Sequence, residues 1–428
     1  MIFHFVSPFA YMDPLSSNLT NVFVELLHES LNEYTHIANL AGLKLEITST
    51  IYGIKMTIDG YDDHAFVLLE KSMDQMINFK IDPKWFETLK YKIKCRNFDD
   101  IELNTVNYLE MLLAEQHWLN NELLESIAPL RADRSLCDRL IKLFIPKLFS
   151  KMYVECLIYG NVTKDEAKGI GKLIKSMLKT KELPIVPLLQ NQLYREIKLK
   201  NGCYIRFEEE NKVQKTSSTI VYYAIGLRTT KSNMLLSLLN QIIEEPCYNT
   251  LRTTESLGYT VFSKICTIMM NGMQYLTVAV QGGYQPRYVE KRIDSFMKDM
   301  FKHISTMPKE KFNNHKKSLD SLYLKAPDTI TSQGSLYWKE IESQAYNFNR
   351  VNIEKEHLKT ITQKQLLQFF KKNILINTRR KLSVHVMPTA MAVERNLPDT
   401  ARRITVTSSD NKIKKFDNLM SFKLSQKK

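Results

Sequence analysis

The chain has 428 residues, 44% of them hydrophobic and 25% charged, which is ordinary for a globular protein and leaves room for two domains. The formal net charge is +14, but Lys and Arg are spread along the chain without an aromatic-interleaved RNA motif, which disfavours a nucleic-acid-binding protein. No apolar run approaches the roughly 18 residues of a membrane helix, and the first residues lack the basic region of a secretory signal.

The first half of the chain predicts a helix, a strand pair and then several helices. In order, the expected elements are a helix at about Asn21–Leu40, strands at Leu43–Thr48 and Tyr52–Ile58, a helix at about Asp63–Asn78, further helices, and a late strand at Met152–Tyr159. Gly42 suits the left-handed cap that commonly ends a helix. Pro83 suits the first turn of the charged helices that follow.

The second half repeats this order. We expect a helix at about Asn233–Ser256, strands at Tyr259–Cys266 and Gln274–Gln281, a helix at about Pro286–His303, charged helices, and a late strand at Leu382–Val386. Gly258 takes the place of Gly42 as the helix cap, and Pro308 takes the place of Pro83. The repeat predicts two copies of one α+β unit.

The seam between the copies is expected at Glu182–Gln192, where Pro184 and Pro187 indicate a short linker. We therefore expect two domains, residues 1–185 and residues 186–428. The second domain ends in the densest basic segment of the chain, which contains Arg402-Arg403 and Lys414-Lys415. We expect this segment to be a solvated tail.

The six cysteines stand far apart and form no C-x-x-C pair. Neither a disulfide framework nor a zinc knuckle matches this spacing. We therefore expect reduced thiols and a cytoplasmic protein.

The most specific motif runs from Glu244 to Ser263, EEPCYNTLRTTESLGYTVFS. It closely resembles the signature of the C-terminal half of the insulysin family, zinc metallopeptidases of the pitrilysin clan. The resemblance extends from about Ser7 to Met391. The other blocks that carry it are Ser7–Tyr11, Ser30–Tyr34, Thr50–Gly53, Tyr346–Phe348 and Leu382–Val386.

The resemblance implies that this chain supplies the third and fourth of the family's α+β domains, antiparallel-rich sheets packed with helices. In the family, strands precede the point that matches Ser7. A chain that begins at Met1 would then start inside the first sheet and present unpaired strand edges. We therefore expect the first copy to be N-terminally truncated, as in a fragment or a truncated gene product.

Arg252 and Tyr259 match, residue by residue, the family's two donors from this half to the scissile peptide. A guanidinium binds carbonyl oxygens in a forked geometry, and a tyrosine hydroxyl donates to a developing oxyanion. The spacing alone favours a structural arginine beside a half-buried tyrosine. The resemblance favours Arg252 and Tyr259 as catalytic residues.

No zinc site is expected in this chain. The family's metal site uses H-x-x-E-H on a helix, and none of the nine histidines begins that motif or H-E-x-x-H. The best cluster is Glu25, His28, Glu29, Glu33 and His36. A helix would separate His28 from His36 by about 12 Å, too far to share one ion.

Other chemistries lack support. The chain contains no G-x-S-x-G elbow, P-loop or G-x-G-x-x-G, so no cofactor-binding residues are assigned. The family associates a lysine-rich loop with binding of ATP-like anions. The matching segment, Leu324–Ile330, keeps Pro327 but little of that basic run, which leaves such regulation unsupported.

The resulting prediction is the C-terminal, substrate-chamber half of an insulysin-like zinc metalloendopeptidase, inactive alone or active when complemented. Expected partners are peptide substrates, an N-terminal catalytic half on the same or a separate chain, and a second copy through the C-terminal half. The alternative is a noncatalytic peptide-binding or scaffold protein of the same fold. A nucleic-acid-binding protein, whose affinity would fall steeply with salt, is the third hypothesis.

Overall fold

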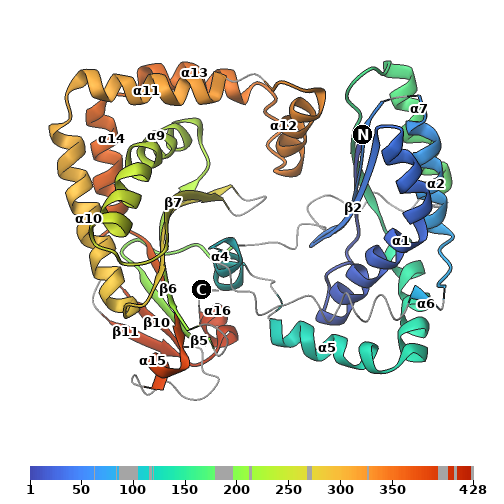
Figure 1. The fold of residues 1–428 in the computed structure, drawn as a ribbon, viewed down its shortest axis with the longest axis horizontal. Coiled ribbons are helices and arrows are strands. Elements are labelled where there is room, and N and C mark those ends of the chain that lie inside the picture. Colours follow the sequence, from blue (N-terminus) through green and yellow to red (C-terminus); the bar gives the residue numbers. More distant parts are fainter. Residues whose placement is uncertain are drawn as a thin grey trace. The chain divides into compact units, whose positions relative to one another are not determined.

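The computed structural model describes residues 1–61, 63–82, 84–85, 105–114, 118, 120–178, 196–211, 215–267, 272–324, 327–393, 403–408 and 412–425 (Figure 1). These residues form two compact units. Unit 1 comprises Met1–Asp100, Trp118–Leu193 and Pro327–Lys339, and unit 2 comprises Ile101–His117, Tyr194–Ala326 and Glu340–Lys428. The predicted seam lies outside the described residues, and the division into residues 1–185 and 186–428 stays a prediction.

Unit 1 is built on a four-stranded antiparallel sheet in the order β2-β3-β1-β4. Its strands are β1 (Ile2–Val6), β2 (Leu43–Thr50), β3 (Gly53–Gly60) and β4 (Tyr153–Leu157). Its helices are α1 (Pro14–Leu40), α2 (Ala65–Ile77), α5 (Asn120–Ala132), α6 (Arg134–Ser150) and α7 (Lys164–Met177), with most of α12 (Ile330–Glu342). Figure 1 shows α1 and α2 along one face of the sheet.

Helix α1 begins earlier than the apolar period alone predicted. The Asp13 carboxylate accepts a hydrogen bond from the Ser16 amide at 2.7 Å, and Pro14 occupies the first turn. Both are start signals, because a helix leaves its first amides unpaired and proline has no amide to lose. The strand β1 was not predicted, yet it lies between β3 and β4, with Phe3 and Phe5 fully buried.

Unit 2 is built on a seven-stranded sheet in the order β11-β10-β5-β9-β6-β8-β7. Its strands are β5 (Tyr204–Asn211), β6 (Ser217–Leu227), β7 (Thr260–Thr267), β8 (Met273–Gly282), β9 (Lys381–Pro388), β10 (Arg403–Thr407) and β11 (Ile413–Phe416). The β5–β9 pair is parallel, and the other described pairs are antiparallel.

The helices of unit 2 are α4 (Thr105–Leu113), α9 (Thr230–Cys247), α10 (Pro286–Thr306), α11 (Lys309–Leu324), α13 (Arg350–Thr360), α14 (Gln363–Phe370), α15 (Thr389–Val393) and α16 (Leu419–Ser425), with π-helical segments η1 (Tyr248–Thr254) and η2 (Lys371–Leu375). Helices α9, α10 and α14 share one core with the sheet face that carries Val221 and Val278. On the opposite face, Tyr108 of α4 packs against Phe207 of β5. The α+β fold class is confirmed.

The repeated order of helix, strand pair and helix is present in both units. Gly42 has a φ of 80°, which confirms its left-handed cap. The parallel prediction for Gly258 is wrong, because the left-handed residue there is Ser256, with a φ of 52°. Gly258 is needed for space, since a Cβ atom at that position would lie 2.0 Å from the Gln281 carbonyl oxygen.

The predicted Asn233–Ser256 helix is α9 followed by η1. Thr229 caps the start of α9, its hydroxyl accepting from the Ser232 amide at 3.1 Å. Pro246 lies inside the helix and cannot donate a backbone hydrogen bond. The wider π-helical turns begin two residues later. Such insertions are frequent at functional sites.

The predicted solvated tail is corrected. Residues 403–407 form β10, which pairs with β5 and buries Ile404 and Val406, and α16 buries Phe422 completely. The alternation of Ile404 and Val406 is a strand pattern that the surrounding charge obscured. The edge strand β11 exposes Lys414 and Lys415. Among the helices of the described residues, none is long and apolar enough to cross a membrane.

Candidate functional site

The structure brings the side chains of Arg252 and Tyr259 together. The guanidinium carbon of Arg252 lies 4.6 Å from the centre of the Tyr259 ring and 4.8 Å from that of Tyr248. Both distances lie within the roughly 6 Å of a cation–π contact. Arg252 is half-buried, whereas 81% of Tyr259 is exposed. Arg252 is thus held between two tyrosines while Tyr259 projects to the surface.

A tight turn connects the two residues. The Glu255 amide donates to the Thr250 carbonyl oxygen at 2.9 Å, the i to i−5 bond of a π-helix, and the Ser256 amide donates to the Arg252 carbonyl oxygen at 3.1 Å. The positive φ at Ser256 costs on the order of 1 kcal/mol and persists only where the surroundings impose it. The turn therefore reverses the chain at the end of η1 and places Tyr259 beside Arg252.

Close backbone packing fixes where strand β7 begins. A Cβ atom at Gly258 would lie 2.0 Å from the Gln281 carbonyl oxygen, and one at Gly282 would lie 2.1 Å from the Leu257 carbonyl oxygen. Leu257 itself is 1% exposed. The residue before Tyr259 is therefore pinned against the end of β8, with no room for a side chain.

The turn is also tied to helix α10. Arg292 donates from Nε to one carboxylate oxygen of Glu255 at 2.8 Å and from a terminal nitrogen to the other at 2.6 Å. This bidentate pair raises the pKa of Arg292, chiefly through the hydrogen bonds from Arg292 to Glu255. Sequence reasoning missed this pair, because 37 residues separate its partners and no local pattern joins them.

The arrangement suits binding of a carbonyl or carboxylate oxygen. Within the described residues, no hydrogen bond engages the Arg252 guanidinium or the Tyr259 hydroxyl. A guanidinium offers five N–H donors and a phenol offers one O–H donor. The two donor sets are neighbours, because the guanidinium lies against the Tyr259 ring.

The histidines of the best sequence cluster are not arranged to share a metal ion. The His28 imidazole donates from Nε2 to the Ile47 carbonyl oxygen at 2.6 Å, and His36 is exposed further along the same helix. In the part of the chain that the structure describes, no three His, Cys, Asp or Glu side chains are grouped closely enough to hold a metal. The metal-binding side chains of these segments are therefore too dispersed to form a zinc centre.

A second polar cluster, buried between α10 and the sheet, was not predicted. Glu290 on α10 accepts from Lys381 Nζ at 2.6 Å and from the Tyr204 hydroxyl at 2.7 Å, and its other oxygen lies 3.0 Å from Nε2 of His385. Burial opposes ionisation of Glu290, but His385 and Lys381 together hold its pKa well below the usual range. The signal was available: Lys381, Ser383 and His385 alternate along one face of β9. The cluster joins α10 to the sheet.

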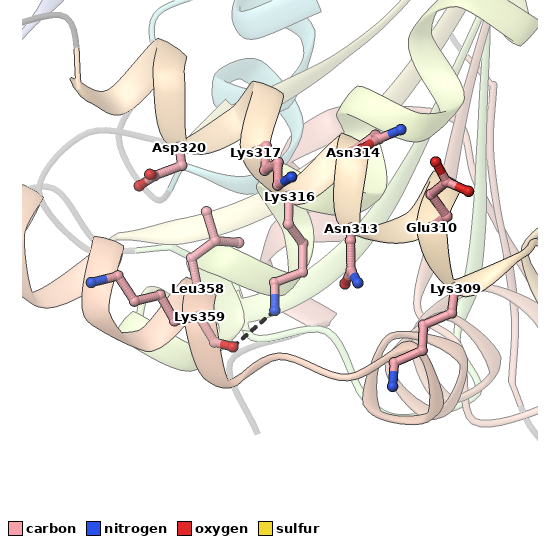
Figure 2. Close-up of a pocket in the computed structure, with 9 residues that line it drawn as sticks. All are labelled: Lys309, Glu310, Asn313, Asn314, Lys316, Lys317, Asp320, Leu358 and Lys359. Atoms are coloured by element: carbon pink, nitrogen blue, oxygen red, sulfur yellow. Dashed lines mark hydrogen bonds between the residues drawn. The ribbon is translucent and has the colours of Figure 1, made fainter.

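A hollow of about 600 Å³ lies between α11 and α13 (Figure 2). Figure 2 shows Lys316 reaching across it to donate to the Lys359 carbonyl oxygen at 2.8 Å. Burial lowers the pKa of Lys316. The hollow is lined by Lys309, Glu310, Asn313, Asn314, Lys316, Lys317, Asp320, Leu358 and Lys359. None of the predicted site residues lines it, and its charges of both signs partly offset one another.

Comparison with known proteins identifies the family. Residues 1–126 match the family model described as the middle or third domain of peptidase M16. Residues 238–338 match the model of the PqqF-like C-terminal lobe, domain 4.

The chain is similar to insulin-degrading enzymes over nearly its whole length. It is 38% identical to the Homo sapiens enzyme over 397 residues, which covers 91% of this chain and 38% of that protein. It is 36% identical to the Drosophila melanogaster enzyme, covering 99% of this chain and 42% of that protein. A putative zinc protease of Schizosaccharomyces pombe is 31% identical, and the match covers 90% of this chain and 39% of that protein. The chain therefore spans about two fifths of the length of these relatives.

Solved structures share the fold. Pitrilysin matches with a TM-score of 0.77 at 16% identity, covering 95% of this chain and 44% of that chain. A peptidase M16 inactive domain from Pseudomonas fluorescens matches with a TM-score of 0.62 at 11% identity, and the match covers 91% of this chain and 92% of that chain. Together with the sequence relatives, these matches place the chain in the insulysin branch of the pitrilysin-type M16 peptidase family, as a counterpart of the C-terminal half of its members.

Proposed function

We propose that this chain is the C-terminal, substrate-chamber half of an insulysin-like zinc metalloendopeptidase that degrades peptides. The observation that carries the proposal is the contact between Arg252 and Tyr259, 4.6 Å from guanidinium carbon to ring centre, inside the family signature. Family membership and the exposure of Tyr259 support it.

Each residue has a distinct role in this proposal. The Arg252 guanidinium binds a substrate carbonyl and orients the peptide, and its contacts with two tyrosine rings limit how far it swings. The Tyr259 hydroxyl donates to the oxygen that gains negative charge as the carbonyl becomes tetrahedral. Pre-positioned donors of this kind lower the barrier, because they need no reorganisation as the charge develops.

The metal and the general base would come from an N-terminal half, on the same or a separate chain. Zinc in such a site polarises the carbonyl and activates water. Within the described residues, His28 of the best sequence cluster is engaged with the Ile47 carbonyl oxygen. We further propose a cytoplasmic setting from the spacing of the cysteines, and self-association through the second domain as the family resemblance implies.

The test is reconstitution. The purified chain is mixed with the catalytic N-terminal half of an insulysin-type relative, and cleavage of a fluorogenic peptide is followed. We expect Tyr259→Phe to lower kcat on the order of a hundredfold, as loss of one transition-state donor does. We expect Arg252→Ala to lower kcat/KM by a similar factor. Full activity in both variants would show that the assigned roles are wrong.

The alternative is a noncatalytic peptide-binding or scaffold protein. It is favoured by the fold match to a domain described as inactive, of which 92% is covered, and by the lack of an H-x-x-E-H motif in the sequence. This alternative predicts that the purified chain binds peptides, and that adding any N-terminal half produces no chelator-sensitive cleavage. Reconstituted cleavage that depends on Tyr259 excludes it.

A further inference from the structure

We propose that Glu255 and Arg292 are positioning residues for the Arg252–Tyr259 pair, and that their ion pair sets the direction in which both donors point. This inference rests on the proposed function for its catalytic consequence. Its structural part stands by itself, because Glu255 lies in the turn that connects Arg252 with Tyr259.

The Glu255–Arg292 ion pair, called the brace below, has a bidentate geometry. Two parallel hydrogen bonds of 2.8 and 2.6 Å join the Arg292 guanidinium to the Glu255 carboxylate. Bidentate pairs of this kind fix orientation as well as distance. Arg292 projects from α10, which is anchored in the core by Val289 and Ile293, 2% and 0% exposed. The ion pair therefore ties the turn to a helix that is anchored separately in the core.

The ion pair lies directly beside the residue at which the chain reverses. Glu255 immediately follows η1, which carries Arg252, and it precedes Ser256, whose φ of 52° reverses the chain. On the far side of Ser256, Leu257 is buried and Gly258 is pressed against β8. The strained residue is thus held from both sides, by the ion pair before it and by packing after it. Releasing the first constraint lets η1 rotate relative to β7.

The ion pair should matter for the geometry of the site and little for the overall stability of the protein. The side chains of Arg292 and Glu255 are 36% and 18% exposed, and partly exposed ion pairs add little to the overall stability of a protein. Misplacement of a reacting group by about 1 Å, by contrast, can lower a rate about a hundredfold. Loss of the pair should therefore change the site far more than the unfolding transition.

The first experiment requires no peptidase activity. The full chain is labelled with 3-fluorotyrosine, and the Tyr259 resonance is assigned with Tyr259→Phe. Its fluorine shift reports the cation over the ring. We expect Arg292→Gln and Glu255→Gln to move this resonance toward its position in Arg252→Ala, with an unchanged melting temperature. Lys302→Gln, an exposed cation of the same helix, is the matched control and should leave the resonance in place. A wild-type resonance in both brace variants overturns the proposal.

The second experiment measures the catalytic consequence in the reconstituted enzyme. Arg292→Gln should lower kcat by about tenfold to a hundredfold with little change in KM, since it misdirects donors that act in the transition state. In a background of Arg252→Ala with Tyr259→Phe, the same change should cost less than about twofold, because a positioning residue acts only through the residues it positions. An undiminished loss in that background would overturn the catalytic part.

The two proposals fail differently. If Tyr259→Phe retains wild-type activity while Arg292→Gln moves the fluorine resonance, the proposed function is wrong and the positioning role stands. If Tyr259→Phe loses activity while Arg292→Gln changes neither resonance nor kcat, the function stands and the positioning role is wrong.

Discussion

The His4 imidazole lies edge-on to the Trp338 indole, with ring centres 6.3 Å apart. These residues are 334 positions apart in the sequence, yet both belong to unit 1. His4 is 2% exposed, its Nε2 lies 3.0 Å from the Thr50 hydroxyl oxygen, and Lys55 stands 5.7 Å over the Trp338 ring. A neutral histidine therefore helps to join the segment 327–339 to the first sheet.

This contact makes the stability of unit 1 depend on pH. Burial, helped by Lys55, lowers the pKa of His4 from 6.5 to about 4. The unfolded chain therefore binds the proton first, and stability present above pH 6.5 is lost as the pH falls toward 4. We expect a loss on the order of 3 kcal/mol in the free energy of unfolding. Urea titration followed by tryptophan fluorescence measures it, because all three tryptophans lie in unit 1.

Two histidine variants test that assignment. In His4→Gln, which cannot be protonated, the dependence between pH 6.5 and 4 should largely disappear. In His64→Gln, which replaces an exposed histidine, the pH dependence of stability should remain. An equal slope in the two variants would assign the effect to another group.

Gly258→Ala should destabilise unit 2. The added Cβ atom would lie 2.0 Å from the Gln281 carbonyl oxygen, so the backbone must shift. We expect the free energy of unfolding to fall by about 1–3 kcal/mol, the range for overpacking, and Tyr259 to be displaced. The matched control is Gly169→Ala inside α7, where nothing lies within 4 Å of the new atom. That change should raise the free energy of unfolding by about 0.5–1 kcal/mol. Chemical denaturation of both variants measures the contrast.

Lys381→Met should also destabilise unit 2. It leaves Glu290 and Asp294, now 2.6 and 2.7 Å from Lys381 Nζ, without their shared cation. Removing one partner of a buried ion pair costs about 3–5 kcal/mol. Lys302→Met, on an exposed surface, should change the free energy of unfolding by less than about 0.5 kcal/mol. Urea titration of the two variants measures the difference, and comparable values would mean that the buried network carries little stability.

Arg252→Lys should not restore the function of arginine in the reconstituted enzyme. A lysine ammonium keeps the charge but lacks the planar fork that lies against Tyr248 and Tyr259. We expect kcat/KM to fall at least about tenfold, close to the value for Arg252→Ala. Near-complete activity in Arg252→Lys would mean that charge alone suffices and that the forked geometry has no role.

The sequence was sufficient for elements whose signals are local. Apolar period and turn residues located the strand pairs in both units, because side-chain alternation repeats every two residues. Gly42 was identified as a left-handed cap for a similar reason, and its φ of 80° agrees. The signature around Arg252 and Tyr259 indicated the candidate site, and their spacing across a helix end allowed them to meet.

The tertiary structure decided what depends on partners far away in the sequence. The place of β1 between β3 and β4, the parallel pairing of β5 with β9, and the membership of residues 327–339 in unit 1 follow from long-range packing. The requirement for glycine at Gly258 arises from the Gln281 carbonyl oxygen, and the Glu255–Arg292 brace joins residues 37 apart. A periodic pattern reports which face of an element is apolar, but not which distant surface covers that face, and so these relationships were beyond prediction from the sequence alone.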